Sequence, residues 1–235
     1  GAEAYKMMSG SKVFGEEMKS LGFPCLYGST ANAPFDYIGD FFRGTRGIML
    51  DMYRQPDKLL EAIEKVLPIM IESAISLAER SGIPRVFIPL HKGADGFMSR
   101  EQFKTFYWPT LRRLMLGLID AGLTPCPFME GNYESRLEII EDIPAGKAMY
   151  AFERTDIFKA KEVLGDRVCI KGNVPSSLLC TGTPEQVRGY CKKLIDVVGK
   201  GGGFIMDGDA GIPDEAKVEN VMAMFDFTRE YGVYS

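Results

Sequence analysis

The chain has 235 residues, 46% of them hydrophobic and 26% charged, and its 28 basic and 32 acidic residues give a net charge of −4. These values are close to globular averages and exclude collagen-like, low-complexity and disordered chains. The mild acidity argues against a nucleic-acid partner, because nucleic-acid binders usually carry a basic face. No apolar run approaches the roughly 20 residues of a membrane span, and no secretory signal is visible. We therefore expect neither a nucleic acid nor a membrane as a partner.

The cysteines point to a reducing compartment. There are five, an odd number, and no two have the Cys-x-x-Cys spacing of a redox or zinc-ribbon motif. A disulfide framework is therefore not expected, and a cytoplasmic location fits best. His91 is the single histidine, which excludes a His-rich metal cage within this chain.

The predicted elements alternate between helices and strands. The stretch Ala2–Gly22 has the pattern of a helix that leads into the first strand. Six apolar runs of five or six residues follow, each bounded by Gly, Pro or charged residues, as is typical of buried strands. These runs are Phe23–Tyr27, Arg85–Leu90, Thr124–Met129, Lys147–Phe152, Arg167–Lys171 and Gly203–Asp207.

Amphipathic helices are predicted between these runs. The longest is Pro56–Ser81, which starts on a favoured first residue and is stopped by Gly82. Ser99 and Gln102 have the spacing of a capping box and begin a helix that runs to about Gly122. Shorter helices are expected at Glu134–Glu141, Asp156–Leu164, Pro184–Val198 and Pro213–Tyr231.

This alternation predicts an α/β fold with a parallel sheet. Two architectures remain open at this point: an open doubly wound sheet, or a (β/α)8 barrel of the TIM type that lacks its first two strands. Only six βα units are visible, and no linker or repeat divides residues 1–235, so a single domain is expected. The sequence has no Gly-rich phosphate loop and no Gly-x-Ser-x-Gly elbow, so nucleotide binding and serine hydrolysis are unsupported.

Polar residues follow nearly every predicted strand, and in both architectures the carboxyl ends of the strands form the working face. His91 fits a metal ligand or a general acid–base near pH 7, but also a histidine with purely structural hydrogen bonds. Glu130 fits a ligand or a general base, but also a carboxylate beside a helix N-terminus. The other strand-end residues of interest are Asn132, Arg154, Lys171, Asn173 and Asp209.

Two kinds of residue have a simpler interpretation. Cys126 and Cys169 lie within predicted strands and are expected in the core rather than in a reactive site. Asp207 and Asp209 differ by two positions, so they share one side if the strand extends that far, and such a pair needs a cation or a proton between its carboxylates. Asp209 also has the surroundings of an ordinary turn residue in Asp-Gly-Asp-Ala-Gly.

Three ordered stretches resemble the uroporphyrinogen decarboxylase superfamily. They are Gly39–Gln55 (GDFFRGTRGIMLDMYRQ), Val168–Thr183 (VCIKGNVPSSLLCTGT) and the ending Gly202–Met224. The family fold is a (β/α)8 barrel, and the match begins at what looks like its third strand. The resemblance therefore implies that the chain is about the C-terminal two-thirds of a family member.

The superfamily includes cofactor-free tetrapyrrole decarboxylases and corrinoid-dependent methyltransferases that use zinc. The sequence of Gly93–Pro109 resembles the methyltransferase branch more than the decarboxylases. In that branch a His-x-Cys-Gly motif supplies zinc ligands, whereas this chain has Phe128 in place of the histidine and Glu130 in place of the cysteine. Asp209 lies near the position of the second ligand cysteine. The thiolate form of the zinc site is therefore absent, although Zn also accepts nitrogen and oxygen ligands.

The prediction that follows is a methyltransferase that moves a methyl group between a small methylated compound and a corrinoid protein. His91 and Glu130 are the predicted catalytic residues, and with Asp209 they are the predicted zinc ligands. The predicted substrate-binding residues are Asn132, Arg154, Lys171, Asn173 and Asp209. The alternatives are decarboxylation of a tetrapyrrole and a non-catalytic corrinoid- or porphyrin-binding module. Because a barrel without two strands exposes its edges, a homodimer is a further expectation.

Overall fold

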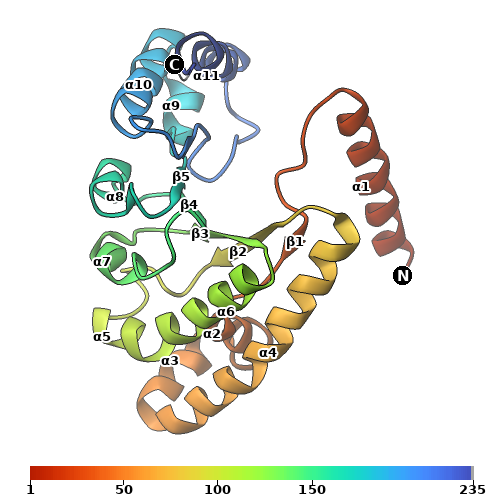
Figure 1. The fold of residues 1–235 in the computed structure, drawn as a ribbon, viewed down its shortest axis with the longest axis vertical. Helices are drawn as coiled ribbons and strands as arrows, with labels where there is room; N and C mark the ends of the chain where they lie inside the picture. Colours follow the sequence, from red (N-terminus) through yellow and green to blue (C-terminus); the bar gives the residue numbers. More distant parts are fainter. Residues whose placement is uncertain (234–235) are drawn as a thin grey trace.

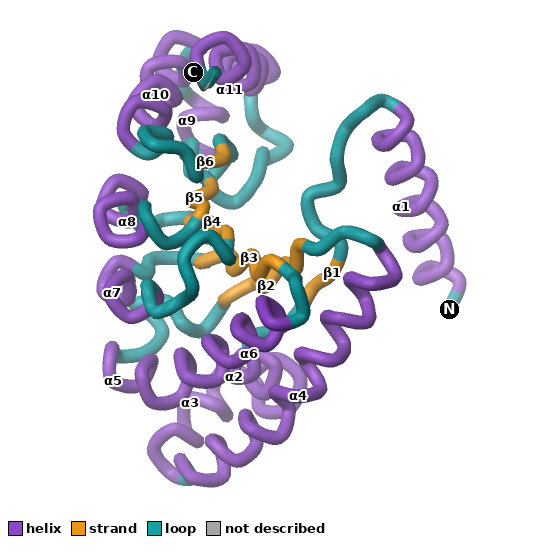
Figure 2. The backbone as a smooth tube through the Cα atoms, in the orientation of Figure 1, coloured by secondary structure: helices purple, strands orange, loops and turns teal. Residues whose placement is uncertain are grey.

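The computed structural model describes residues 1–233, and within the first helix it does not describe the side chains at positions 2, 4, 5, 7–9, 11 and 12. Its centre is one parallel sheet of six strands in chain order, seen edge-on in Figure 2. The strands are β1 (Ser29–Thr30), β2 (Arg85–Leu90), β3 (Thr124–Met129), β4 (Met149–Phe152), β5 (Cys169–Lys171) and β6 (Phe204–Ile205).

The strands β2 and β3 form the best-paired part of the sheet. Six residue pairs are in register, from Arg85 opposite Thr124 to Leu90 opposite Met129. Alternate residues of β2 are fully buried against the helices, and Val86 and Ile88 have no exposed surface. Both strands are largely buried, which explains why their apolar runs located them with their observed ends.

Helices cover one face of the sheet (Figure 1). The longest, α4 (Pro56–Ser81), ends at Gly82, which has the left-handed conformation that glycine adopts without strain. Ser99 and Gln102 form the predicted capping box, after which the helix continues without a break. The covering helices that follow are α5 (Arg100–Gln102), η2 (Phe103–Tyr107), α6 (Trp108–Asp120), η3 (Glu134–Arg136), α7 (Leu137–Ile140) and α8 (Ile157–Leu164).

A helical insertion connects β1 to α4 and was not predicted. It consists of α2 (Pro34–Ile38), the π-helix η1 (Gly39–Arg43) and α3 (Gly44–Arg54). Because this insertion follows β1, it leaves the sheet at the carboxyl ends of the strands. Its first turn is deeply buried, and Phe35 and Asp36 have no exposed surface.

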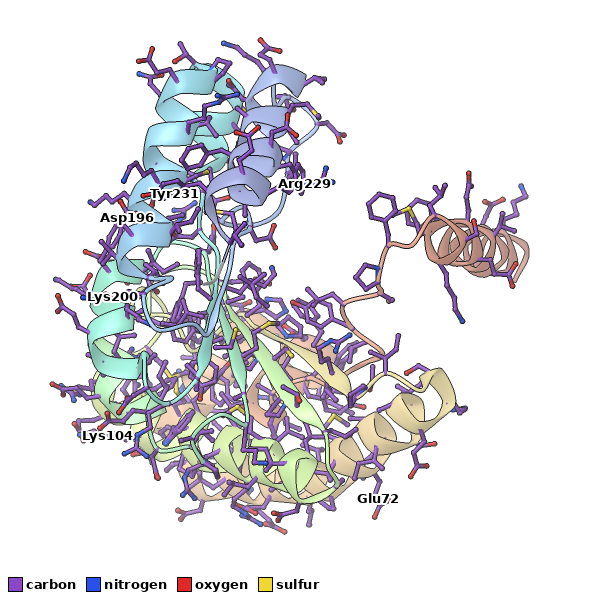
Figure 3. All side chains as sticks on the ribbon, turned by 45° about the horizontal axis from the view of Figure 1, so that its top comes forward. Glu72, Lys104, Asp196, Lys200, Arg229 and Tyr231 are labelled. Atoms are coloured by element: carbon purple, nitrogen blue, oxygen red, sulfur yellow. The ribbon has the colours of Figure 1, made fainter. Side chains whose placement is uncertain are left out.

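The C-terminal part is built from short strands and three helices, α9 (Ser176–Thr181), α10 (Pro184–Val197) and α11 (Val218–Tyr231). The strands β5 and β6 share only two pairs in register. The helices α10 and α11 pack side by side (Figures 1 and 3), and the Tyr231 hydroxyl donates a hydrogen bond of 2.8 Å to Asp196 between them.

The sheet does not close among the described strands, since β1 and β6 lie at opposite edges of the strand order. The predicted incomplete barrel is therefore confirmed. The first helix, α1 (Ala2–Ser20), lies away from the rest of the molecule in Figures 1 and 3. None of the helices in the described part of the chain is long and apolar enough to cross a membrane.

The last three strands are shorter than predicted, and two predicted elements differ more strongly from the structure. Phe23–Tyr27 is not a strand, and the first strand is instead Ser29–Thr30, which pairs with Val86 and Phe87. The apolar Phe23 is 57% exposed, so its run is apolar without being part of the buried sheet. The last helix begins at Val218 rather than at Pro213, because residues 213–217 form turns.

Candidate functional site

The two predicted catalytic residues meet at the carboxyl ends of neighbouring strands. His91 directly follows β2 and Glu130 directly follows β3, and the pairing of Leu90 with Met129 places these next residues side by side. The His91 Nδ1 atom lies 2.7 Å from the Glu130 Oε2 atom. Both side chains are about one-third exposed, so a ligand can reach the pair while the backbone beneath it is fixed.

A buried carboxylate holds the end of β2. The Asp36 Oδ2 atom accepts hydrogen bonds from the His91 backbone N–H at 2.9 Å and from the Tyr107 hydroxyl at 2.6 Å. Its Oδ1 atom accepts the Lys92 backbone N–H at 3.1 Å. Burial raises the pKa of Asp36, while the hydrogen bonds from Tyr107 and His91 act in the opposite direction.

Two tyrosines pack beside this carboxylate. Tyr107 and Tyr133 are buried, and burial raises the pKa of both hydroxyls well above the usual value. The Tyr133 hydroxyl donates to the Leu90 carbonyl at 3.0 Å. Gly93 passes so close that a Cβ atom there would lie 2.8 Å from a ring atom of Tyr107 and from the Tyr133 hydroxyl. The turn after β2 therefore has little freedom to move.

The side chain of Lys92 is also fixed. It is 7% exposed and forms an ion pair with Asp40, which belongs to the η1 helix. Gly39 lets this lysine approach, because a Cβ atom at that position would lie 2.9 Å from the lysine Cε atom. Lys92 therefore offers no free charge to a ligand.

The turn after β3 is held by charged groups of its neighbours. Glu153, which follows β4, accepts a hydrogen bond of 2.6 Å from the Gly131 N–H. Arg136 is buried, donates to the Met98 carbonyl at 2.6 Å and lies 3.3 Å from Asp95. These contacts tie together the turns that follow β2, β3 and β4.

The predicted substrate-binding residues fall into a separate group. Arg154, Asn173 and Asp209 line a cavity of about 500 Å³ together with Tyr190 and Lys193. Asn173 donates to two backbone carbonyls at 3.2 Å, so its amide is engaged within the fold. Arg154 differs from the others in that its side chain is 77% exposed.

Further predicted site residues also have partners within the chain. Asp209 accepts two hydrogen bonds from Ser176, one from its hydroxyl and one of 3.0 Å from its backbone N–H. Lys171 forms an ion pair with Asp207. Asn132 accepts the Glu134 N–H at 2.9 Å.

The two strand cysteines have raised thiol pKa values. Burial raises the pKa of Cys126 to about 12 and also raises that of Cys169. At neutral pH neither thiol has appreciable thiolate character. Cys126 is buried in the core as expected, whereas Cys169 is only partly buried.

The predicted zinc site was tested against these contacts. Among the residues that the structure describes, no three His, Cys, Asp or Glu side chains are gathered closely enough to hold a metal ion. The pair His91–Glu130 supplies two donors, whereas a catalytic zinc site uses three protein ligands. The described residues therefore do not fit zinc by themselves, zinc binding stays a prediction, and no step below uses it.

The comparisons with known proteins decide the family. The family Uroporphyrinogen decarboxylase (URO-D) matches residues 25–231, which is most of the chain. The chain belongs to this family. Two relatives named uroporphyrinogen decarboxylase illustrate the similarity. The protein from Methylococcus capsulatus is 27% identical over 197 residues, covering 83% of this chain and 55% of the relative. The protein from Chlorobium luteolum is 32% identical over 183 residues, covering 76% of this chain and 51% of the relative.

The chain thus spans about half the length of these curated URO-D relatives. Among solved structures, a methyltransferase from Methanosarcina mazei matches with a TM-score of 0.70 and 20% identity, covering 87% of this chain and 58% of that chain. At this identity the match shows a shared fold. Both findings confirm the resemblance that the sequence motifs indicated, including a partial family member.

Sequence reasoning missed Asp36 and Asp40. The pattern carried one usable signal, an acidic residue between Phe35 and Tyr37 in an otherwise apolar turn. A buried carboxylate needs partners, so this position could have been marked as functional or structural. Its partner, the His91 backbone, is 55 residues away, and no local pattern identifies that contact.

Proposed function

We propose that this URO-D family chain carries the catalytic face of a methyltransferase, which passes a methyl group from a small methylated compound to a corrinoid on another protein. The single observation that supports this proposal most is the contact of His91 with Glu130 at 2.7 Å. A carboxylate that accepts from Nδ1 stabilises the imidazolium and leaves Nε2 as the atom that exchanges a proton with a substrate.

The proposed chemistry balances as follows. The bond between the methyl carbon and its oxygen, nitrogen or sulfur breaks, and that heteroatom keeps the electron pair. The methyl group is taken up by the reduced corrinoid, which supplies the electron pair of the new bond. The heteroatom receives a proton from the His91 Nε2 atom, and Glu130 holds the imidazole during the transfer. A positioned acid of this kind contributes about 10²–10⁴-fold to a rate.

Decarboxylation of a tetrapyrrole is the alternative, and the name of the curated relatives favours it. A substrate with many carboxylates needs free cationic groups at the rim. Lys92 and Lys171 are paired with Asp40 and Asp207, so their charges are already neutralised. Arg154 is the one predicted substrate residue with a largely exposed cationic side chain. In the part of the rim that this chain forms, Arg154 and Lys193 are thus the exposed cationic side chains of the cavity, and this small number favours methyl transfer.

The test uses the native protein that contains this chain, because the chain spans about half of its relatives. Purified protein is incubated with a reduced corrinoid and a set of O-, N- and S-methyl compounds, and methylcobalamin is followed by its absorbance. In parallel, uroporphyrinogen turnover is followed by chromatography. We expect methyl transfer with at least one donor and no decarboxylation.

Two variants assign the residues. Glu130→Gln and His91→Gln should lower the methyl-transfer rate by about 10²-fold or more, whereas Arg112→Gln, which changes an exposed ion pair with Asp142, should leave it unchanged. Decarboxylation of uroporphyrinogen, or binding of a tetrapyrrole without turnover of any substrate, would overturn the proposal.

A further inference from the structure

We propose that Asp36 is the positioning residue of the His91–Glu130 pair. It touches neither ring nitrogen of His91, but it fixes the backbone from which the imidazole projects. The inference rests on the proposed role of the pair, and it names a residue that neither the sequence motifs nor the family comparison identified.

The hydrogen bonds of Asp36 explain why a carboxylate is required at this position. Its two oxygens accept from three donors, the N–H groups of His91 and Lys92 and the hydroxyl of Tyr107, at 2.6–3.1 Å. An asparagine has one acceptor oxygen and a donor group in place of the other. It would therefore leave at least one of these donors facing another donor in a buried site.

The same helical segment fixes the next residue by its side chain. Asp40 lies four positions after Asp36 on the continuous segment α2–η1 and pairs with the Lys92 side chain. The insertion after β1 therefore holds the turn after β2 at two points, one on the backbone and one on a side chain. The π-helical turn that carries Asp40 is a feature often found at functional sites.

The location of Asp36 makes a purely stabilising role a poor explanation. The side chain has no exposed surface, and burial raises its pKa, so keeping a carboxylate there opposes folding unless its hydrogen bonds are all made. An apolar side chain of similar volume would avoid this cost. An apolar side chain could not accept hydrogen bonds from the consecutive N–H groups of His91 and Lys92.

The readout is the tautomer of His91, which can be measured without substrate. His91 is the single histidine of these 235 residues, so ¹⁵N-histidine labelling of the native protein that contains this chain, compared with its His91→Gln variant, identifies the His91 imidazole signals. A neutral His91 in contact with Glu130 should carry its proton on Nδ1, since the carboxylate accepts there. In Glu130→Ala the proton should move largely to Nε2, and this variant defines the limit without the contact.

Asp36→Asn should lower the ratio of the Nδ1–H to the Nε2–H tautomer roughly tenfold, the size expected for losing one hydrogen bond to a charged group. Tyr107→Phe removes one donor to Asp36 and should shift the ratio in the same direction by less. Tyr150→Phe is the matched control, because it removes a buried tyrosine hydroxyl that bonds the Ile140 carbonyl, away from the turn that carries His91. It should leave the ratio unchanged.

Circular dichroism shows whether each variant is folded. If Asp36→Asn does not fold, the comparison of Tyr107→Phe with Tyr150→Phe still decides the question. A folded Asp36→Asn protein with the wild-type tautomer ratio, or equal shifts in the two tyrosine variants, would overturn the inference. Because no substrate is used, a negative methyl-transfer assay with a clear tautomer shift would reject the proposed function and leave this inference intact.

Discussion

The carboxyl ends of the strands form a rim, and two parts of this rim use polar residues in different ways. At the β2–β3 rim, defined by His91 and Glu130, the two side chains contact each other and stay about one-third exposed. At the β5–β6 rim, defined by Lys171 and Asp207, the two charges neutralise each other and the lysine is 14% exposed. The sheet beneath differs as well, with six residue pairs in register at β2–β3 and two at β5–β6.

This difference indicates where in the fold polar side chains remain available for a ligand. Beneath the β2–β3 rim, the buried groups Asp36, Tyr107 and Arg136 hold the backbone of the turns, so the side chains above them are free to contact a substrate. At the β5–β6 rim, the polar side chains themselves hold the loops, as Asp209 does with Ser176. Side chains with structural partners have less capacity left for a ligand.

A large effect on stability is expected for Arg136→Ala. This buried guanidinium bonds the Met98 carbonyl, pairs with Asp95 and lies 5.1 Å from the ring centre of Phe103. Its loss leaves the buried Met98 carbonyl without this donor and Asp95 without its cation, although Asp95 keeps its hydrogen bonds from Ser135, and we expect a cost of about 3 kcal/mol. Urea denaturation measures the change. Arg154→Ala, at a 77% exposed side chain, should stay within about 0.5 kcal/mol, and an equal cost for both arginines would contradict the comparison.

The next prediction compares the same substitution in the strands β2 and β6, which lie beneath the two rims. Ile88 in β2 has no exposed surface, whereas Ile205 in β6 is 36% exposed. Ile88→Ala should therefore lower the free energy of unfolding by about 2–5 kcal/mol, the usual cost of a cavity in a core. Ile205→Ala should cost less than about 1 kcal/mol. Thermal and urea unfolding of both variants check this, and a larger loss at Ile205 would mean that the β6 edge is a main part of the core.

A smaller effect depends on pH and concerns the insertion that supports the β2–β3 rim. Asp51 accepts bonds of 2.5 and 2.9 Å from Arg43 and one of 2.8 Å from Gln55, and the guanidinium lowers the pKa of this carboxyl. A lowered pKa stabilises the fold above the unfolded-state value near 4 and loses this stabilisation as the pH falls through the folded value.

The corresponding variant is Asp51→Asn. At pH 7 it should be less stable than wild type by about 1–2 kcal/mol, since hydrogen bonds to a charged group are replaced by weaker ones. The difference should shrink as the pH falls below about 4. Urea titrations at pH 7 and pH 3 provide the measurement, and a difference that is independent of pH would show that the ion pair with Arg43 is not its source.

The sequence predicted the regular parts of this architecture and brought His91 and Glu130 together as candidates, but it did not predict the contacts that support them. Bounded apolar runs located β2 and β3, and an apolar stripe with a terminal glycine located α4, because burial leaves a local record in the sequence. Strands of two residues, such as Ser29–Thr30, leave too short a pattern to recognise. The role of Asp36 depends on contacts with residues 55 to 71 positions away, which no local pattern encodes.

Three of the predicted site residues have structural hydrogen bonds that explain their position at the strand ends. Asn132, Asn173 and Asp209 follow strands as functional residues often do, yet each hydrogen-bonds backbone groups nearby. A strand end needs such partners whether or not it binds a ligand. Position at the carboxyl end therefore selects candidates, and only the contacts separate those that are engaged from those that are available.

The most direct test of the account compares one side chain from each rim in the native protein that contains this chain. The kcat/KM for methyl transfer is measured for His91→Gln and for Asp207→Asn. The account predicts a loss of about 10²-fold or more at His91 and less than about tenfold at Asp207, whose partner is Lys171. Equal losses at the two rims, or a loss confined to Asp207, would contradict the claim that the β2–β3 rim carries the chemistry.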